Sequence, residues 1–125
     1  MKTRIGITLM AGLMLTACDD RAEREADKAR ALKVVYIAGR EMDEARRRAD
    51  RPDATSRDHE EYRAALDRLE KRKANAAAVG VEDWKIQSEA LAGSVDATSE
   101  RAVKTLADAE KRDALKRAEE EANLK

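Results

Sequence analysis

Two short segments, Arg51-Pro52-Asp53 and Val79-Gly80-Val81, interrupt a chain that otherwise favours helix. Proline lacks the amide proton that a helix interior needs, and it pushes the residue before it out of the helical region. Glycine is the usual left-handed residue that closes a helix. The positions of these two breaks predict three helices, over about residues 21–49, 54–78 and 82–122.

The supply of large apolar side chains limits how these helices can pack. Leu, Ile and Val account for 15 of the 108 residues from Cys18 to Lys125, and the chain has no Phe. Ala, Leu, Glu, Lys and Arg, which are strong helix formers, make up most of the chain. Short connections favour side-by-side neighbours. We therefore expect an all-α fold, an elongated antiparallel helical hairpin or three-helix bundle with coiled-coil-like packing.

The first expected helix has apolar side chains at spacings of three and four, which places them on one face. The most apolar part, here called the first-helix patch, consists of Leu32, Val35, Tyr36 and Met42. This patch is either the core contact of the helix, which its spacing favours, or a surface for a protein partner. On the opposite, solvated face we expect ion pairs between residues four apart with the acid first. These pairs are Asp43–Arg47 and Glu44–Arg48.

The second helix should begin with a capping box, because Thr55 stands three residues before Asp58. The third helix should pack through a seam of residues at spacings of three, four and seven: Trp84, Leu91, Val95, Thr98, Ala102, Leu106 and Ala109. We expect Trp84 to be its largest core residue rather than an interface anchor. The seam thins beyond Ala109, and the last part of this helix should fray or protrude.

The first 18 residues have the order of an export signal. Lys2 and Arg4 precede an uncharged apolar segment, residues 5–15, which is too short as a helix to cross the hydrocarbon core of a membrane. Leu15-Thr16-Ala17-Cys18 follows, and it contains the only cysteine. This arrangement resembles the lipobox of bacterial lipoproteins, in which the signal peptide is cleaved before a cysteine that is lipidated.

The resemblance implies cleavage between Ala17 and Cys18. It divides the chain into a signal peptide (1–17), a lipidated N-terminus with sorting residues (18–20) and a helical domain (21–125). Cys18 would attach the protein durably to a membrane, facing the periplasm. The alternative is that Cys18 is not lipidated and is a small buried hydrophobic residue.

Asp19 and Asp20 follow the cysteine directly. In lipoproteins of enteric bacteria, which this start resembles, an aspartate at the first position disfavours transfer to the outer membrane, and a second acid reinforces the effect. We therefore expect the periplasmic face of the inner membrane, with the outer membrane as the alternative.

No arrangement typical of an active site is found in the sequence. The single histidine, His59, has no second histidine or free thiol to share a metal ion, and adjacent residues on a helix point about 100° apart. We therefore expect no enzymatic activity, no metal and no other cofactor. The 26 basic and 26 acidic residues balance, which argues against nucleic acid as a partner.

The densest basic run is Arg46-Arg47-Arg48 with Arg51. It can contact anionic phospholipid. It can equally form a solvated face, which its acidic neighbours favour. These neighbours are Asp43, Glu44, Asp50 and Asp53.

Together these features predict a membrane-tethered periplasmic lipoprotein that acts as a non-catalytic helical interaction or spacer module. Its partner would be an unidentified envelope protein or a second copy of the chain. One alternative follows from a similarity in outline to the major murein lipoprotein, whose terminal lysine is joined to peptidoglycan. Lys125 would take that role, although Pro52 and Gly80 depart from the single uninterrupted helix of that family. Another alternative is an accessory or exclusion lipoprotein of a conjugation or secretion system.

Overall fold

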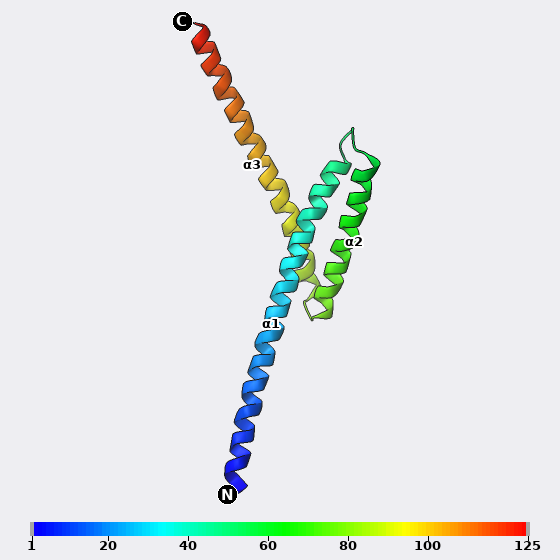
Figure 1. Cartoon of the computed structure of the whole chain (residues 1–125), viewed down its shortest axis with the longest axis vertical. Coiled ribbons are helices and arrows are strands. Elements are labelled where there is room, and N and C mark those ends of the chain that lie inside the picture. The colour runs from blue at the N-terminus through cyan, green and yellow to red at the C-terminus, as the bar shows by residue number, and fades with distance from the viewer. Residues whose placement is uncertain (1, 125) are drawn as a thin grey trace.

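The computed structural model describes the backbone of residues 2–124 and the side chains of residues 20–124. Three helices follow one another, α1 (Lys2–Ala49), α2 (Ser56–Ala78) and α3 (Asp83–Asn123). The described residues contain no strand, so the prediction of an all-α three-helix fold is confirmed. Figure 1 shows α2 running back alongside α1, whereas α3 crosses α1 at an angle. Both helices pack on α1 and touch each other little.

The two breaks in the sequence end helices as predicted. Gly80 has a φ of 94°, the left-handed conformation that closes α2. At the start of α2 the Thr55 hydroxyl accepts a hydrogen bond from the Asp58 amide at 3.3 Å, and the Asp58 carboxylate accepts one from the Thr55 amide at 2.9 Å. The predicted capping box is therefore confirmed. Because Thr55 is the extended cap residue, α2 begins at Ser56, slightly later than expected.

A thin core lies between α1 and its two neighbours. It consists of Val35, Ala38, Leu69, Ala76, Val81, Ile86 and Ala90. Alanine supplies three of these seven residues, and Val35 and Ile86 are the largest apolar side chains that are fully buried. Small side chains let the helices lie close together but bury little apolar area, so the core contributes modestly to stability.

The face that α3 turns toward α1 is different from the predicted one. Its buried residues are Ile86, Ala90, Gly93 and Ala97. Trp84 is 61% exposed, and Leu91 and Leu106 are each 65% exposed. The prediction that Trp84 and this seam form the core contact of α3 is therefore wrong.

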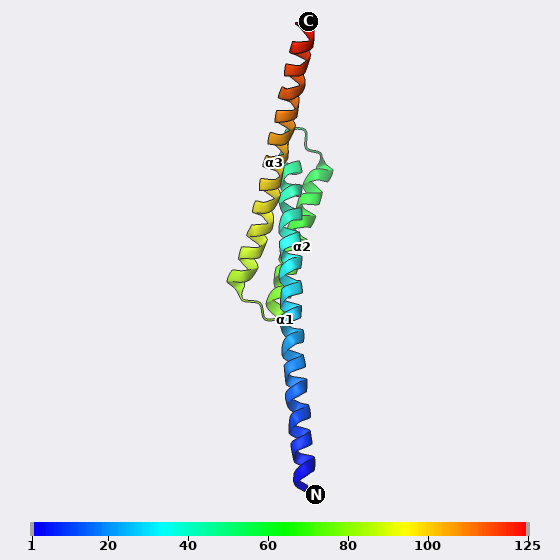
Figure 2. The same ribbon diagram turned by 90° about the vertical axis from the view of Figure 1, so that its left-hand side faces the viewer.

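Beyond Arg101, α3 extends away from α1 and α2. Every side chain from Ala102 to Leu124 is exposed, except that of Ala109, which is half-buried. In both views this part of α3 and the first part of α1 project from opposite ends of the three-helix body (Figures 1 and 2). The molecule is consequently elongated. No helix of the described residues combines the length and apolar character needed to cross a membrane.

Candidate functional site at the crossing of α1 and α3

Two glycines lie at the crossing of α1 and α3, each against the backbone of the other helix. A methyl group on Gly39 would lie 2.3 Å from the carbonyl oxygen of Ala90. One on Gly93 would lie 2.1 Å from the carbonyl oxygen of Tyr36. Both distances are far below contact distance, so any side chain at either position would push the helices apart. The crossing is a backbone-to-backbone contact, which explains why the buried positions of α3 after Ile86 hold only small residues, Ala90, Gly93 and Ala97.

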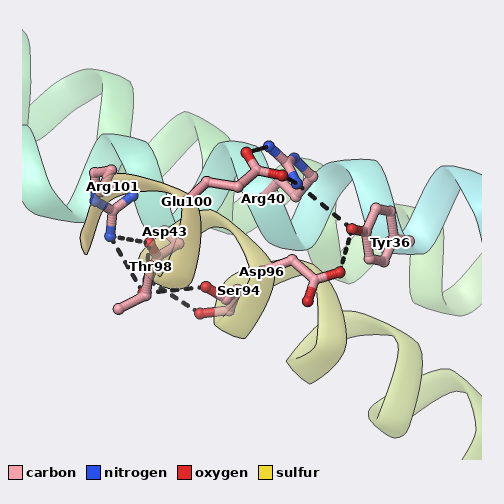
Figure 3. A network of polar contacts seen from close by, with 8 residues as sticks. All are labelled: Tyr36, Arg40, Asp43, Ser94, Asp96, Thr98, Glu100 and Arg101. Carbon is pink, nitrogen blue, oxygen red and sulfur yellow. Dashed lines mark hydrogen bonds and ion pairs between the residues drawn. The ribbon is translucent and has the colours of Figure 1, made fainter. Parts of the chain in front are cut away.

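Asp43 lies beside this crossing and is fully buried. Its carboxylate accepts hydrogen bonds from both helices: Arg46 Nη2 at 2.7 Å, Ser94 Oγ at 3.0 Å, Thr98 Oγ1 at 3.2 Å, and Arg101 Nη2. Figure 3 shows the three donors from α3 converging on Asp43. The predicted pair of Asp43 with Arg47 on a solvated face is therefore wrong, because Asp43 points inward and its cationic partners are Arg46 and Arg101.

The pKa of the Asp43 carboxyl reflects two opposing effects. Burial raises it, because a charged group loses hydration in the interior. Hydrogen bonds from Arg101, Ser94 and Thr98, together with the charge of Arg101, lower it by more. The pKa therefore lies below its ordinary value of 3.8, and Asp43 is a buried carboxylate that is ionised at neutral pH.

An outer layer of polar contacts flanks Asp43 on the same two helices (Figure 3). The Tyr36 hydroxyl donates a hydrogen bond to the Asp96 carboxylate. Arg40 donates to both carboxylate oxygens of Glu100, one of them at 2.9 Å. These hydrogen bonds from Arg40 lower the pKa of Glu100. The bidentate pair adds geometric specificity to the crossing.

Hydrogen bonds occupy both oxygens of Asp43 and of Glu100. Hydrogen bonds from arginine lower the pKa of both carboxyl groups, which makes each a weaker general base. An intact buried ion pair adds little net stability, whereas an arrangement that leaves one partner buried and unpaired is costly. The arrangement therefore fixes where α3 crosses α1 and at what angle. Among the described residues, no group of three or more His, Cys, Asp or Glu side chains is placed to hold a metal ion.

The first-helix patch lies mostly inside the body. Val35 is fully buried, Leu32 and Met42 pack against the core, and Tyr36 belongs to the crossing. All four residues thus make contacts within this chain. The expected pair of Glu44 with Arg48 is also replaced, since Arg48 lies 3.8 Å from Glu61 of α2.

The remaining residues singled out in the sequence are exposed or outside the described part. His59 is exposed on α2, and Asp20 is exposed on α1. Ala17, Cys18 and Asp19 fall outside the residues whose side chains the structure describes, as does Lys125. The expectations for cleavage, lipidation and sorting therefore stay predictions.

The predictions from the sequence do not include the polar contacts of the crossing. A signal for them exists, because Tyr36, Arg40 and Asp43 are spaced by four and three residues. On α3, Ser94, Thr98 and Arg101 have the same spacing. Two polar rows of equal spacing beside a glycine on each helix are a pattern that would have indicated their contact.

The outer face of α3, opposite the crossing, carries uncovered apolar side chains. They are Trp84 (61% exposed), Leu91 (65%), Val95 (51%), Val103 (66%) and Leu106 (65%). Exposed apolar residues that gather on one face of a helix are typical of surfaces that meet another molecule.

Comparisons of the chain with protein-family models, with curated proteins and with solved structures find no match.

Proposed function

We propose that this protein is a lipid-anchored protein of the bacterial envelope whose helical body acts as a non-catalytic interaction or spacer module. The observation that carries this proposal is the arm formed by the last part of α3, which projects beyond the body at the end opposite the start of α1. At about 1.5 Å per residue, residues 102–123 alone extend roughly 33 Å. A chain held at Cys18 would carry this arm on the side of the body far from the membrane.

The form of α1 supports a role in spacing. It is one continuous helix through the described residues, so no flexible linker separates the region of Cys18 from the body. The body begins near Lys28, which lines a cavity together with Gly80 and Val81 of the α2–α3 connection. About ten residues, or roughly 15 Å of helix, thus separate the proposed anchor from the body.

Exposed apolar residues on the arm support a role in interaction. Val103 is 66% exposed, and Leu106 and Leu115 are each 65% exposed. An isolated helix of this kind draws little stability from tertiary packing, so contact with a partner helix would stabilise it.

Site-specific crosslinking in the native envelope tests the interaction. A photo-reactive amino acid at Leu106 or Leu115 is expected to give a crosslinked product of defined mass. The same amino acid at Arg63, which is exposed on α2, is the control and should not give that product. Equal labelling from all three positions would contradict a specific contact of the arm.

Metabolic labelling tests the anchor. Replacing Cys18 with Ala should leave a precursor that keeps its signal peptide and takes up no radioactive palmitate. Normal maturation of that variant would contradict lipidation at this residue.

A further inference from the structure

Four arginines line an open groove where the end of α1 meets α3. The groove has a volume of about 220 Å³, and its lining residues are Glu44, Arg47, Arg48, Arg51 and Arg101. The lining residues are four arginines and one glutamate, which gives them a net charge of about +3, although Asp43 already pairs with Arg101 and Glu61 lies 3.8 Å from Arg48. In a chain whose charges balance overall, this is a local excess of positive charge.

Hydrogen-bond donors remain available in this groove. Arg101 is not among them, because its Nη2 is bound to Asp43 and Thr98 and its Nη1 is buried. The nearest acid to Arg48 is Glu61 at 3.8 Å, beyond direct hydrogen-bond distance. Within the described part of the chain, the side chains of Arg47 and Arg51 form no ion pair.

We propose that this groove binds a phosphate group. The planar fork of arginine matches two phosphate oxygens at once, and several arginines around one concave site are suited to a group with several charged oxygens. A volume of about 220 Å³ corresponds to roughly seven water molecules, which leaves room for a phosphate and part of its hydration.

The groove and the anchor are independent features. Arg47 lies roughly 44 Å along α1 from Cys18, on the basis of about 1.5 Å per residue.

The phosphate can belong to a soluble compound or to the headgroup of an anionic phospholipid, and the chemistry of recognition is the same for both. A competing explanation is that the arginines only complement the negative end of the α1 dipole.

Calorimetric titration of the full chain in a neutral detergent tests the proposal. We expect saturable binding of inorganic phosphate at constant ionic strength, with one site per chain. A parallel titration uses dihexanoyl phosphatidylglycerol below its micelle concentration, with dihexanoyl phosphatidylcholine as the neutral comparison. Stronger binding of the glycerol lipid than of phosphate assigns the site to lipid headgroups, and the reverse assigns it to soluble phosphate compounds.

Paired substitutions locate the site. Replacing Arg47 and Arg51 with Gln should weaken binding at least about tenfold, because each removes a charge-assisted hydrogen bond. The matched control replaces Arg63 and Arg72, two exposed arginines of α2, with Gln and should leave affinity unchanged. Circular dichroism checks that both variants stay folded. The proposal is overturned by absence of saturable binding to either probe, or by an equal loss of affinity in both double variants.

Discussion

Gly39 and Gly93 determine how closely α3 approaches α1. Each lies against a backbone carbonyl of the other helix, at a distance that leaves no room for a methyl group. Because the obstacle is backbone rather than the end of a flexible side chain, relief requires that a whole helix move. The two positions therefore tolerate only glycine if the crossing is to keep its geometry.

Replacing Gly93 with Ala should destabilise the protein. Because a methyl group here would lie only 2.1 Å from a backbone oxygen, overpacking should cost roughly 2–3 kcal/mol, whereas the higher helix propensity of alanine returns about 1 kcal/mol. We expect a net loss of about 1–2 kcal/mol in the free energy of unfolding, measured by chemical denaturation followed by circular dichroism. Ser99→Ala, at an exposed position of the same helix, is the control and should change stability by less than about 0.5 kcal/mol. An unchanged or raised stability for Gly93→Ala would show that α3 does not cross α1 at this position.

Asp43 is the residue on which the polar side of the crossing depends. Replacing it with Asn removes the charge that pairs with Arg101 while keeping the size of the side chain. Breaking a buried ion pair costs about 3–5 kcal/mol, and the partial exposure of Arg101 argues for the low end of that range. We expect a loss of about 3 kcal/mol in chemical denaturation. The control is Asp67→Asn at an exposed position of α2, with an effect below about 0.5 kcal/mol.

The pKa of Asp43 also predicts a dependence of stability on pH. Because the pKa is lower in the folded chain than its ordinary value of 3.8, the unfolded chain binds a proton first as the pH falls. The contribution of Asp43 is therefore fully present above pH 3.8 and declines as the pH falls toward the folded pKa. Unfolding measured between pH 6 and pH 2 should show less acid destabilisation for Asp43→Asn than for the unchanged chain. Identical pH profiles would contradict the buried, ionised state of Asp43.

The orientation of α3 about its own axis is the main difference between the expected and observed elements. Large apolar residues at Trp84, Leu91 and Leu106 predict one buried face, but the observed one consists of Ile86 followed by the small residues Ala90, Gly93 and Ala97. Hydrophobic periodicity favours the face with the largest side chains. Here close backbone contact selects the face with the smallest, so periodicity alone gives the wrong result.

Two substitutions on α3 test whether the predicted or the observed face of this helix packs on α1. Leu91→Gln should change the free energy of unfolding by less than about 0.5 kcal/mol, because the side chain is 65% exposed. Ile86→Ala should cost about 2–5 kcal/mol, because Ile86 is fully buried in the core. Chemical denaturation of both variants provides the comparison. A larger effect for Leu91→Gln than for Ile86→Ala would restore the predicted seam as the core contact.

Local signals in the sequence predict the elements well and their contacts poorly. Pro52, Gly80 and the pairing of Thr55 with Asp58 act within a few residues, so they can be recognised without knowing the fold. The contact of Asp43 with Arg101 joins residues 58 positions apart. Acidic and basic residues are frequent throughout this chain, so helical spacing alone suggests a local partner for Asp43, namely Arg47. The close approach of the two helices at Gly39 and Gly93 brings Arg101 within reach of Asp43.

At the scale of the whole molecule, the expected location in the inner membrane depends on Asp19 and Asp20, directly after Cys18. The lipoprotein resemblance implies that replacing Asp19 and Asp20 with Ser should move the protein from the inner-membrane to the outer-membrane fraction. Density-gradient separation of the two membranes measures the change. Asp27→Ser, further along the same helix, is the control and should leave the distribution as it was. A double variant that stays in the inner membrane would contradict this role for the two aspartates.

The short crossing and the long arm of α3 together form a lever. Gly93 lies near the pivot, and about 30 residues, or roughly 45 Å of helix, separate it from the end of α3. A rotation of only 10° at the crossing would displace that end by roughly 8 Å. The hydrogen bonds of Asp43 and Arg40, which act within a few residues of the pivot, therefore determine the position of a tip that neither residue approaches.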